Sequence, residues 1–562
     1  MVRLFERHKK RHVYTLDGMW KFKTDPERKG MSEKWYERFP EDASDAVVPS
    51  CWNNDIGLYE YEGMAWYCRT FLTRSENLNI VFHGVTGFAD VYLDGTHLGS
   101  HYGGFTPFSF TVTGLTAGEH TIAVCVDNIH NDTDTIPLAR VDWYHYGGIT
   151  RSVEVMELER AWIKDYRIDY VLSDDLKSAK LNMQVNLESL DGLSHSDMLK
   201  VYINGSKVYE TRVDIKDSTE ISVENLELND IKLWDTDAPN LYSVRFEISE
   251  DDVTERIGFR KIEIRDKQLF LNNKMVYLKG VNRHEDHPDW GFAFPAKLMK
   301  RDIDIIKNLG CNAIRGSHYP NAEAFLDFMD QEGILFWEEI PMWGFPEGVL
   351  KNPLVLERGL KMHEEMIKRD YHHPCVILWG LHNEIDTHTE AGYEITKAFA
   401  EKVRSMDKTR PITYASNHPL EDICFSLVDI VSVNKYFGWY YGEIESWAEF
   451  LSEFREKLEK ENISDKPIII SEFGTAALYG ENTFECIRWT ENYQEKLLSY
   501  TLKLFHEDPD IIGCYIWQYC DIRTAKELGL SRARGFNNKG IVNEYRKPKL
   551  AYWTVKKIFE QQ

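Results

Sequence analysis

The chain has 562 residues, of which 43% are hydrophobic, 28% charged and 13% aromatic. This balance is typical of packed globular proteins and excludes collagen-like, coiled-coil and largely disordered chains. At ~150 residues per domain, the length also excludes a single small module. The formal net charge of −24 argues against nucleic acids and acidic membranes as partners, because a negative surface repels polyanions.

The apolar segments are too short for a membrane span. Residues 375–379 and 468–470 are typical of them, whereas a bilayer needs ~20 apolar residues. Residues 1–11 are basic, but no apolar segment follows them, so we expect a cytoplasmic protein without a secretory signal. The nine cysteines are scattered and form no Cys-x-x-Cys pair, which indicates free, mostly buried thiols.

The first part of the chain consists of short alternating strands separated by turn residues. We expect a β-sandwich over residues 1–157 and a second, immunoglobulin-like sandwich over residues 158–262. Within them, Asp94-Gly95 and residues 204–206 (Asn-Gly-Ser) are typical of hairpin turns, in which the central residues take positive φ.

From about residue 263 to 562, short apolar strands alternate with amphipathic helical patterns, for example at residues 296–307. We expect eight such strands, which begin near residues 276, 312, 334, 376, 412, 430, 468 and 512. Eight β/α units predict a (β/α)₈ barrel, whose chemistry lies on the loops after the strand C-termini.

Two glutamates close apolar strands of this barrel. Glu384 follows the fourth strand and Glu472 the seventh, so both carboxylates face the same mouth. Retaining glycoside hydrolysis needs such a pair, one protonated to act as acid and one ionised to act as nucleophile. A lone strand-end glutamate is commonly only solvated, but the pair, with Asn383 beside the first, favours catalysis.

Several longer segments resemble glycoside hydrolase family 2. Residues 312–320 and 371–384 resemble its two signature patterns, and further matches lie at residues 16–22, 48–53 and 280–285. The resemblance spans nearly the whole chain. It implies a jelly-roll sandwich, an immunoglobulin-like sandwich and a TIM barrel, in that order.

The resemblance also implies roles for individual residues. Glu384 would be the acid/base and Glu472 the nucleophile. Asn383 would contact the sugar 2-hydroxyl, and Tyr436 would donate a hydrogen bond to Glu472. Further substrate contacts would come from Asp142 (at the 4-hydroxyl), His318, Tyr440 and Trp517 (below the sugar ring).

The loop after the eighth strand points to the substrate. Residues 536–549 resemble the Asn-x-Lys motif of β-glucuronidases, in which Asn537 and Lys539 would bind the sugar carboxylate. An anionic sugar that enters a protein of charge −24 needs a fixed cation, and a charge-assisted hydrogen bond supplies ~1.5–3 kcal/mol. Without the family context, a solvated basic surface loop is the favoured interpretation of this segment.

Some features depart from the glucuronidase pattern. Residues 280–285 are more typical of a β-galactosidase, and Ile385 follows the acid/base where glucuronidases usually carry proline. Ala533 occupies the place of a usual arginine, with Arg532 and Arg534 on either side. Which of the two arginines faces the site stays open.

We therefore expect a retaining exo-β-glucuronidase. Its rivals within the family are a β-galacturonidase, which would keep the carboxylate contacts, and a β-galactosidase. A non-catalytic carbohydrate-binding protein is the alternative from another class. Residues 341–350 pass quickly into a helical pattern, so the long loop that covers some glucuronidase sites is expected to be absent.

No cofactor is expected. His284 with Glu285 could in principle hold a metal, but their spacing is not diagnostic, and we predict no metal. The expected partner is a small or oligosaccharide β-glucuronide, with neither nucleic acid nor membrane. Because family members are commonly dimers or tetramers, a homo-oligomer is expected.

Overall fold

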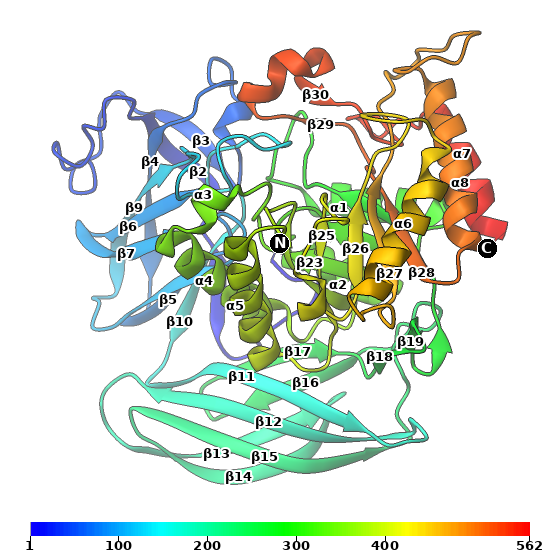
Figure 1. The fold of residues 1–562 in the computed structure, drawn as a ribbon. Coiled ribbons are helices and arrows are strands. Elements are labelled where there is room, and N and C mark those ends of the chain that lie inside the picture. The colour runs from blue at the N-terminus through cyan, green and yellow to red at the C-terminus, as the bar shows by residue number, and fades with distance from the viewer. Residues whose placement is uncertain (1, 562) are drawn as a thin grey trace.

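Two β-sandwiches flank one parallel barrel in the computed structural model, which describes residues 2–561 (Figure 1). The first sandwich pairs a six-stranded sheet with a four-stranded one. The six-stranded sheet runs β3 (Ser44–Val48), β2 (Gly18–Thr24), β4 (Met64–Thr73), β9 (Gly118–Asp127), β6 (Phe88–Leu93) and β7 (Thr96–Tyr102). The four-stranded sheet runs β1 (His12–Thr15), β10 (Val153–Leu158), β5 (Asn77–Phe82) and β8 (Phe108–Val112).

The second sandwich lies below the barrel in Figure 1 and pairs a three-stranded sheet with a four-stranded one. The former contains β11 (Ala161–Leu172), β12 (Ser178–Ser189) and β15 (Ser218–Asn229). The latter contains β14 (Ser206–Ile215), β13 (His195–Ile203), β16 (Tyr242–Glu247) and β17 (Asp252–Ile257). A small sheet of β18 (Ile262–Arg265), β19 (Gln268–Leu271) and β20 (Lys274–Met275) leads into the barrel.

Both expected hairpin turns are present. Asp94 and Gly95 have φ of 48° and 80°, and Asn204 and Gly205 have φ of 48° and 81°, as a type I′ turn requires. Ser206, which the sequence placed in the turn, instead pairs with the last residue of β13 and begins β14. The turn is therefore one residue shorter than expected.

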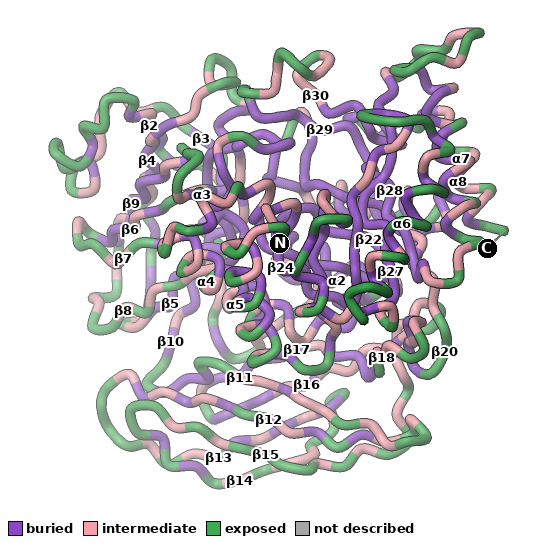
Figure 2. The backbone as a smooth tube through the Cα atoms, viewed as in Figure 1, coloured by how far each residue is buried: buried purple, intermediate pink, exposed green. Residues whose placement is uncertain are grey.

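The predicted barrel is confirmed, with eight parallel strands that close on themselves. They are β21 (Leu278–Arg283), β22 (Ala313–Gly316), β23 (Leu335–Glu339), β24 (Val376–Asn383), β25 (Ile412–Ser416), β26 (Val431–Asn434), β27 (Ile468–Phe473) and β28 (Ile511–Ile516). Strands buried on both faces need near-continuous apolar runs, which is why they stood out in the sequence. Figure 2 shows buried residues concentrated in the barrel.

Helices surround the barrel (Figure 1). They are α1 (Ala296–Asn308), α2 (Glu323–Glu332), α3 (Glu347–Leu350), α4 (Pro353–Asp370), α5 (Glu390–Met406), α6 (Ser446–Lys460), α7 (Glu491–Glu507) and α8 (Leu550–Gln561). After β28, a long segment with β29 (Ile522–Arg523) and β30 (Phe536–Asn537) precedes α8. No helix within residues 2–561 combines the length and apolar character of a membrane span.

Two arginines join the sandwiches to the barrel. Arg151, just before β10, donates to Glu285 Oε2 (3.1 Å) and to the Pro320 carbonyl (2.8 Å). It thereby fixes the loop of the first sandwich that carries Asp142. Near the N-terminus, buried Arg3 donates to Glu255 of the second sandwich and to Asp327 of α2, both at 2.9 Å.

Replacement of Arg3 by alanine is expected to lower the free energy of unfolding by about 3–5 kcal/mol, because Glu255 and Asp327 would remain buried without their cation. Urea denaturation followed by fluorescence measures this change. Arg38→Ala is the matched control, since the Arg38–Glu41 pair is 84% and 87% exposed and such pairs contribute about 0–1 kcal/mol. Equal effects of the two substitutions would contradict the role assigned to Arg3.

Candidate active site

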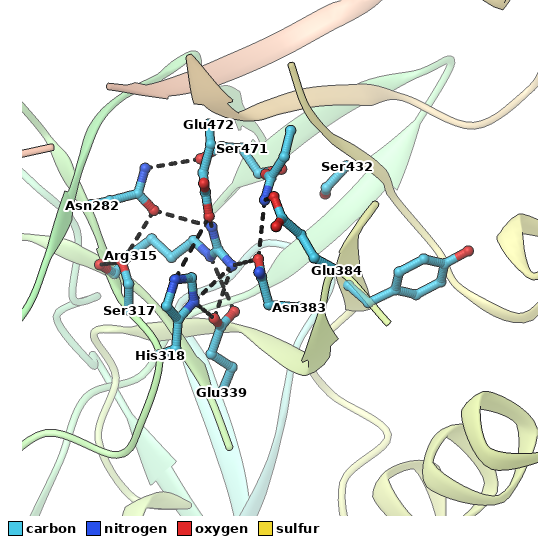
Figure 3. Close-up of polar contacts among 12 residues, drawn as sticks. Asn282, Arg315, Ser317, His318, Glu339, Asn383, Glu384, Ser432, Ser471 and Glu472 are labelled. Atoms are coloured by element: carbon cyan, nitrogen blue, oxygen red, sulfur yellow. Dashed lines mark hydrogen bonds and ion pairs between the residues drawn. The ribbon is translucent and has the colours of Figure 1, made fainter. Parts of the chain in front are cut away.

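The two predicted catalytic glutamates lie at the same rim of the barrel. Glu472 is part of β27, and Glu384 follows the last residue of β24 with a φ of 52°. Because the C-terminal ends of parallel barrel strands open on one mouth, the two side chains meet there. Figure 3 shows both carboxyl groups beside the same cluster of polar side chains.

Glu472 is held by two donors. Arg315 Nη1 donates to its Oε1 at 2.8 Å, and the Tyr436 hydroxyl donates to its Oε2 at 2.6 Å. Burial raises the pKa of Glu472, but Arg315 and Tyr436 oppose this rise, because both stabilise the ionised carboxylate. The pKa of Glu472 stays above its usual value, but these two donors favour its anionic form.

Glu384 has a different environment. Its Oε1 accepts one hydrogen bond, from Asn434 Nδ2 at 2.8 Å. Burial, followed by the negative charge of Glu472, raises the pKa of Glu384 to about 8. Glu384 therefore keeps its proton at neutral pH beside an ionised neighbour. An acid and a nucleophile need this difference in protonation state.

A buried arginine connects these groups. Arg315, the penultimate residue of β22, donates through Nε and Nη2 to Glu339, at 3.0 and 2.8 Å. Nη2 also donates to Asn383 Oδ1 at 2.7 Å. This contact fixes the Asn383 amide, whose buried Nδ2 has no partner within the described residues. The Asn383 amide can therefore donate to a ligand.

One wall of the site is aromatic. The His318 ring stacks on Trp517, with ring centroids 5.2 Å apart. His318 Nδ1 donates to Glu339 Oε1 at 2.7 Å, while burial and the charge of Arg315 lower the pKa of His318 well below its usual range. The imidazole is thus neutral, and its Nε2, like the Trp517 Nε1, has no hydrogen-bond partner within residues 2–561.

A second group, the polar corner, consists of Asp142, Tyr440, Arg532, Asn537 and Lys539. Asp142 accepts from Arg532 Nη2 at 2.6 Å and from Asn537 Nδ2 at 2.9 Å. The Tyr440 hydroxyl accepts from Lys539 Nζ at 2.8 Å and from Arg532 Nη1 at 3.1 Å. The corner therefore combines the first sandwich with the segment after β28, which lie close together in Figure 1.

The open choice between two arginines is resolved by this geometry. Arg532 reaches the polar corner, whereas Arg534 pairs with Glu544 at 2.9 Å. Arg534 has a φ of 62°, so the chain reverses there and directs the two side chains differently. Both arginines stand out in the sequence, but only the fold separates them.

Lys539 is a buried cation without an anionic partner. Its residue is 1% exposed, and within the described residues its ammonium donates to the neutral Tyr440 hydroxyl and to no carboxylate. Lys549, 0% exposed, instead pairs with Asp521 at 2.8 Å. Because an unpaired buried charge is unfavourable, the Lys539 ammonium is suited to an anionic ligand.

The structure brings the ten predicted site residues into two adjoining groups. Around Arg315 lie Glu384, Glu472, Asn383, His318, Trp517 and Tyr436; the polar corner contains Asp142, Tyr440, Asn537 and Lys539. The Tyr436 and Tyr440 rings, 5.3 Å apart, connect the groups. Lys539 Nζ lies 5.7 Å from the Tyr436 ring centroid.

Three residues of the site were not named from the sequence. Glu339 and Asn434 end apolar barrel strands, and Arg315 lies one residue before the end of another. This position is the signal that could have identified them. For the pair considered as metal ligands, His284 Nδ1 lies 3.2 Å from the Tyr319 hydroxyl and Glu285 binds Arg151.

Comparison with known families covers the whole of this architecture. A model described as "Glycosyl hydrolases family 2, TIM barrel domain" matches residues 262–562. The "sugar binding domain" of the same family matches residues 13–159, and a third model, "Glycosyl hydrolases family 2", matches residues 161–260.

Individual relatives are similar over nearly their full length. A β-glucuronidase of Streptococcus agalactiae is 28% identical, with 96% of this chain and 95% of the relative covered. The crystal structure of a β-galacturonidase from Eisenbergiella tayi bound to galacturonate has a TM-score of 0.93 at 33% identity, covering 100% and 99% of the two chains. A β-glucuronidase from an uncultured Clostridium species has a TM-score of 0.89 at 30% identity, covering 100% of each chain.

The raised pKa of Glu384 predicts that Glu384→Gln stabilises the protein at alkaline pH. The unfolded chain ionises this group near pH 4.5, but the folded protein only near pH 8. Between these values the native state therefore loses stability as the pH rises. We expect the variant to gain roughly 2–4 kcal/mol relative to the parent protein at pH 8.

Thermal denaturation at pH 4 and pH 8 checks this sign, and the gain should be small at pH 4. Glu443→Gln, on an exposed loop residue, is the control. A gain that does not grow with pH would mean that Glu384 ionises normally in the folded protein.

Proposed function

We propose that this chain, which belongs to glycoside hydrolase family 2, is an exo-acting β-glucuronidase that works with retention of configuration. Its membership rests on the matched family models, and the substrate is inferred from the geometry of the site.

In the first step, protonated Glu384 gives its proton to the glycosidic oxygen while Glu472 attacks the anomeric carbon. The bond to the aglycone breaks, the aglycone leaves as an alcohol, and a covalent glycosyl ester forms on Glu472. The charge of Glu472 raises the pKa of Glu384, which keeps the proton on the group that acts as the acid.

In the second step, the now ionised Glu384 removes a proton from water. The water attacks the anomeric carbon, the ester to Glu472 breaks, and the sugar leaves with its original configuration. Glu472 is then again the carboxylate that Arg315 and Tyr436 hold. The proton returns to Glu384, so the cycle closes without another reactant.

The observation that carries the uronide assignment is the unpaired ammonium of Lys539. A C6 carboxylate would give this buried cation the anionic partner that the protein does not supply. The neighbouring Asn537 amide lies on the same loop and would add a second donor. A neutral hexose offers no such pairing, which disfavours the β-galactosidase alternative.

The 4-hydroxyl of the sugar is assigned to Asp142. Its carboxylate is fixed by Arg532 and Asn537, beside the residues that would bind C6. An equatorial 4-hydroxyl, as in glucuronides, is our first choice. A β-galacturonidase is the second candidate, favoured by the 33% identity and TM-score of 0.93 to the galacturonate-bound Eisenbergiella tayi enzyme.

The rim beside α3 bears on the size of the aglycone. Residues 340–346 connect β23 directly to α3, and no long insertion covers the mouth from this side in the described structure. We propose that the open side admits bulky aglycones or uronic acid oligosaccharides.

Four p-nitrophenyl glycosides, the β-glucuronide, β-galacturonide, β-galactoside and β-glucoside, test the substrate class. Both uronides should be hydrolysed faster than both neutral sugars, and the glucuronide fastest. Lys539→Ala should lower kcat/KM for the uronides about 10- to 100-fold, because a charge-assisted hydrogen bond is lost. Any activity on the β-glucoside should change little.

Lys547→Ala is the matched control, since Lys547 is exposed on the same segment and should not affect the kinetics. Equal losses on charged and neutral substrates would mean that Lys539 only supports the loop. A preference for the galacturonide would replace the first candidate by the second, and a preference for a neutral sugar would overturn the uronide assignment.

The nucleophile can be trapped. A 2-deoxy-2-fluoro-β-D-glucuronyl fluoride should form a stable ester on Glu472, because fluorine slows the second step more than the activated first step. Peptide mass spectrometry should find the added mass on the Glu472 peptide and none in Glu472→Gln. Labelling of Glu384 instead would reverse the assigned roles.

A further inference from the structure

Three side chains outside the catalytic groups meet on two neighbouring rim loops. Asp386 and His388 lie on the loop after β24, and His418 lies on the loop after β25. One carboxylate oxygen and one nitrogen of each imidazole all lie within 4.8 Å of one another. We infer that these residues form a binding site for a divalent transition-metal ion such as Zn²⁺.

Each of the three side chains has an atom that no other protein group within residues 2–561 hydrogen-bonds. The two imidazole rings, with centroids 5.1 Å apart, form no side-chain hydrogen bond with any other part of residues 2–561. Asp386 uses Oδ2 to accept from the Glu347 amide at 2.7 Å, which fixes the carboxylate and leaves its other oxygen for an ion. By contrast, the His120 and His195 rings each bind a carboxylate directly, at 2.6 and 2.8 Å.

The two loops are also tied together beneath these side chains. Buried Thr387, between the two ligands of the first loop, donates to Asp422 Oδ2 of the second loop. The Ile423 amide donates back to the Thr387 carbonyl at 3.1 Å. The separation between the loops is therefore set by the protein, so less ordering is needed when an ion binds.

The donor set selects the class of metal. Two imidazoles and one carboxylate suit Zn²⁺ and similar first-row ions, whereas Mg²⁺ and Ca²⁺ prefer sites made of oxygen ligands. Three protein ligands leave a fourth position for water or another donor. The other compact group of this kind, Asp330, His373 and Cys375, is buried and already engaged. Asp330 accepts from His373 Nδ1 and from the Cys375 backbone amide, and Cys375 Sγ donates to the Leu326 carbonyl.

The metal site lies next to the proposed catalytic acid in the sequence. Asp386 follows Glu384 by two residues along the same loop. On the proposed function, Glu384 faces the departing aglycone, so the ion would stand beside that group. This placement rests on the proposed function, whereas binding of the ion does not.

The test uses the intact protein and Zn²⁺ alone, titrated in competition with a chromogenic chelator. The parent protein should bind one Zn²⁺ at this site. His388→Ala and His418→Ala should each weaken binding at least about 10-fold, since even the loss of a supporting residue costs 10- to 100-fold. Co²⁺ should give absorption bands of an imidazole-ligated ion in the parent protein that both variants lose.

His506→Ala, an exposed histidine near the end of α7, is the matched control and should bind Zn²⁺ as the parent does. Thermal denaturation and metal-free hydrolysis should be unchanged in all three variants, so failure of the metal site is separate from failure of the proposed function. Equal Zn²⁺ affinity in the parent and the His388/His418 double variant, or no binding by the parent, would overturn the inference.

Discussion

The site depends on one fully buried guanidinium. Arg315 is 0% exposed and pairs with both Glu339 and Glu472, and these carboxylates compensate for the loss of water around the cation. In return, Arg315 favours the ionised form of Glu472. Glu384 lacks such a partner and keeps its proton. On the proposed function, the division of labour between the two glutamates thus follows from the position of one positively charged side chain.

The polar corner depends on how the folded units pack. Asp142 belongs to the first sandwich, whereas Arg532, Asn537 and Lys539 follow the last barrel strand. The hydrogen bonds from Arg532 and Asn537 to Asp142 form only when the sandwich packs against the barrel. Arg151 holds the sandwich loop in this position. The sandwich is therefore part of the site as well as a support for it.

Much of this arrangement could be predicted from the sequence. Buried parallel strands need continuous apolar runs, so all eight strands and the two glutamates at their ends were identifiable. The partners of those glutamates were not. Arg315 on β22 reaches Glu472 on β27 across the barrel. Such a contact exists only once the barrel has closed and strands far apart in the sheet face each other. Arg532 and Arg534 differ by two positions, and only the backbone reversal at Arg534 decides which one faces the site.

The polar corner has one more chemical consequence. On the uronide assignment, Lys539 touches the part of the sugar that does not react, so its attraction is the same before, during and after bond cleavage. Such uniform attraction improves capture of dilute substrate without speeding the turnover of a filled site. The liberated acid carries the same carboxylate as the intact glycoside. The residue that recruits the substrate therefore also retains the product, and product release competes with the next round of catalysis.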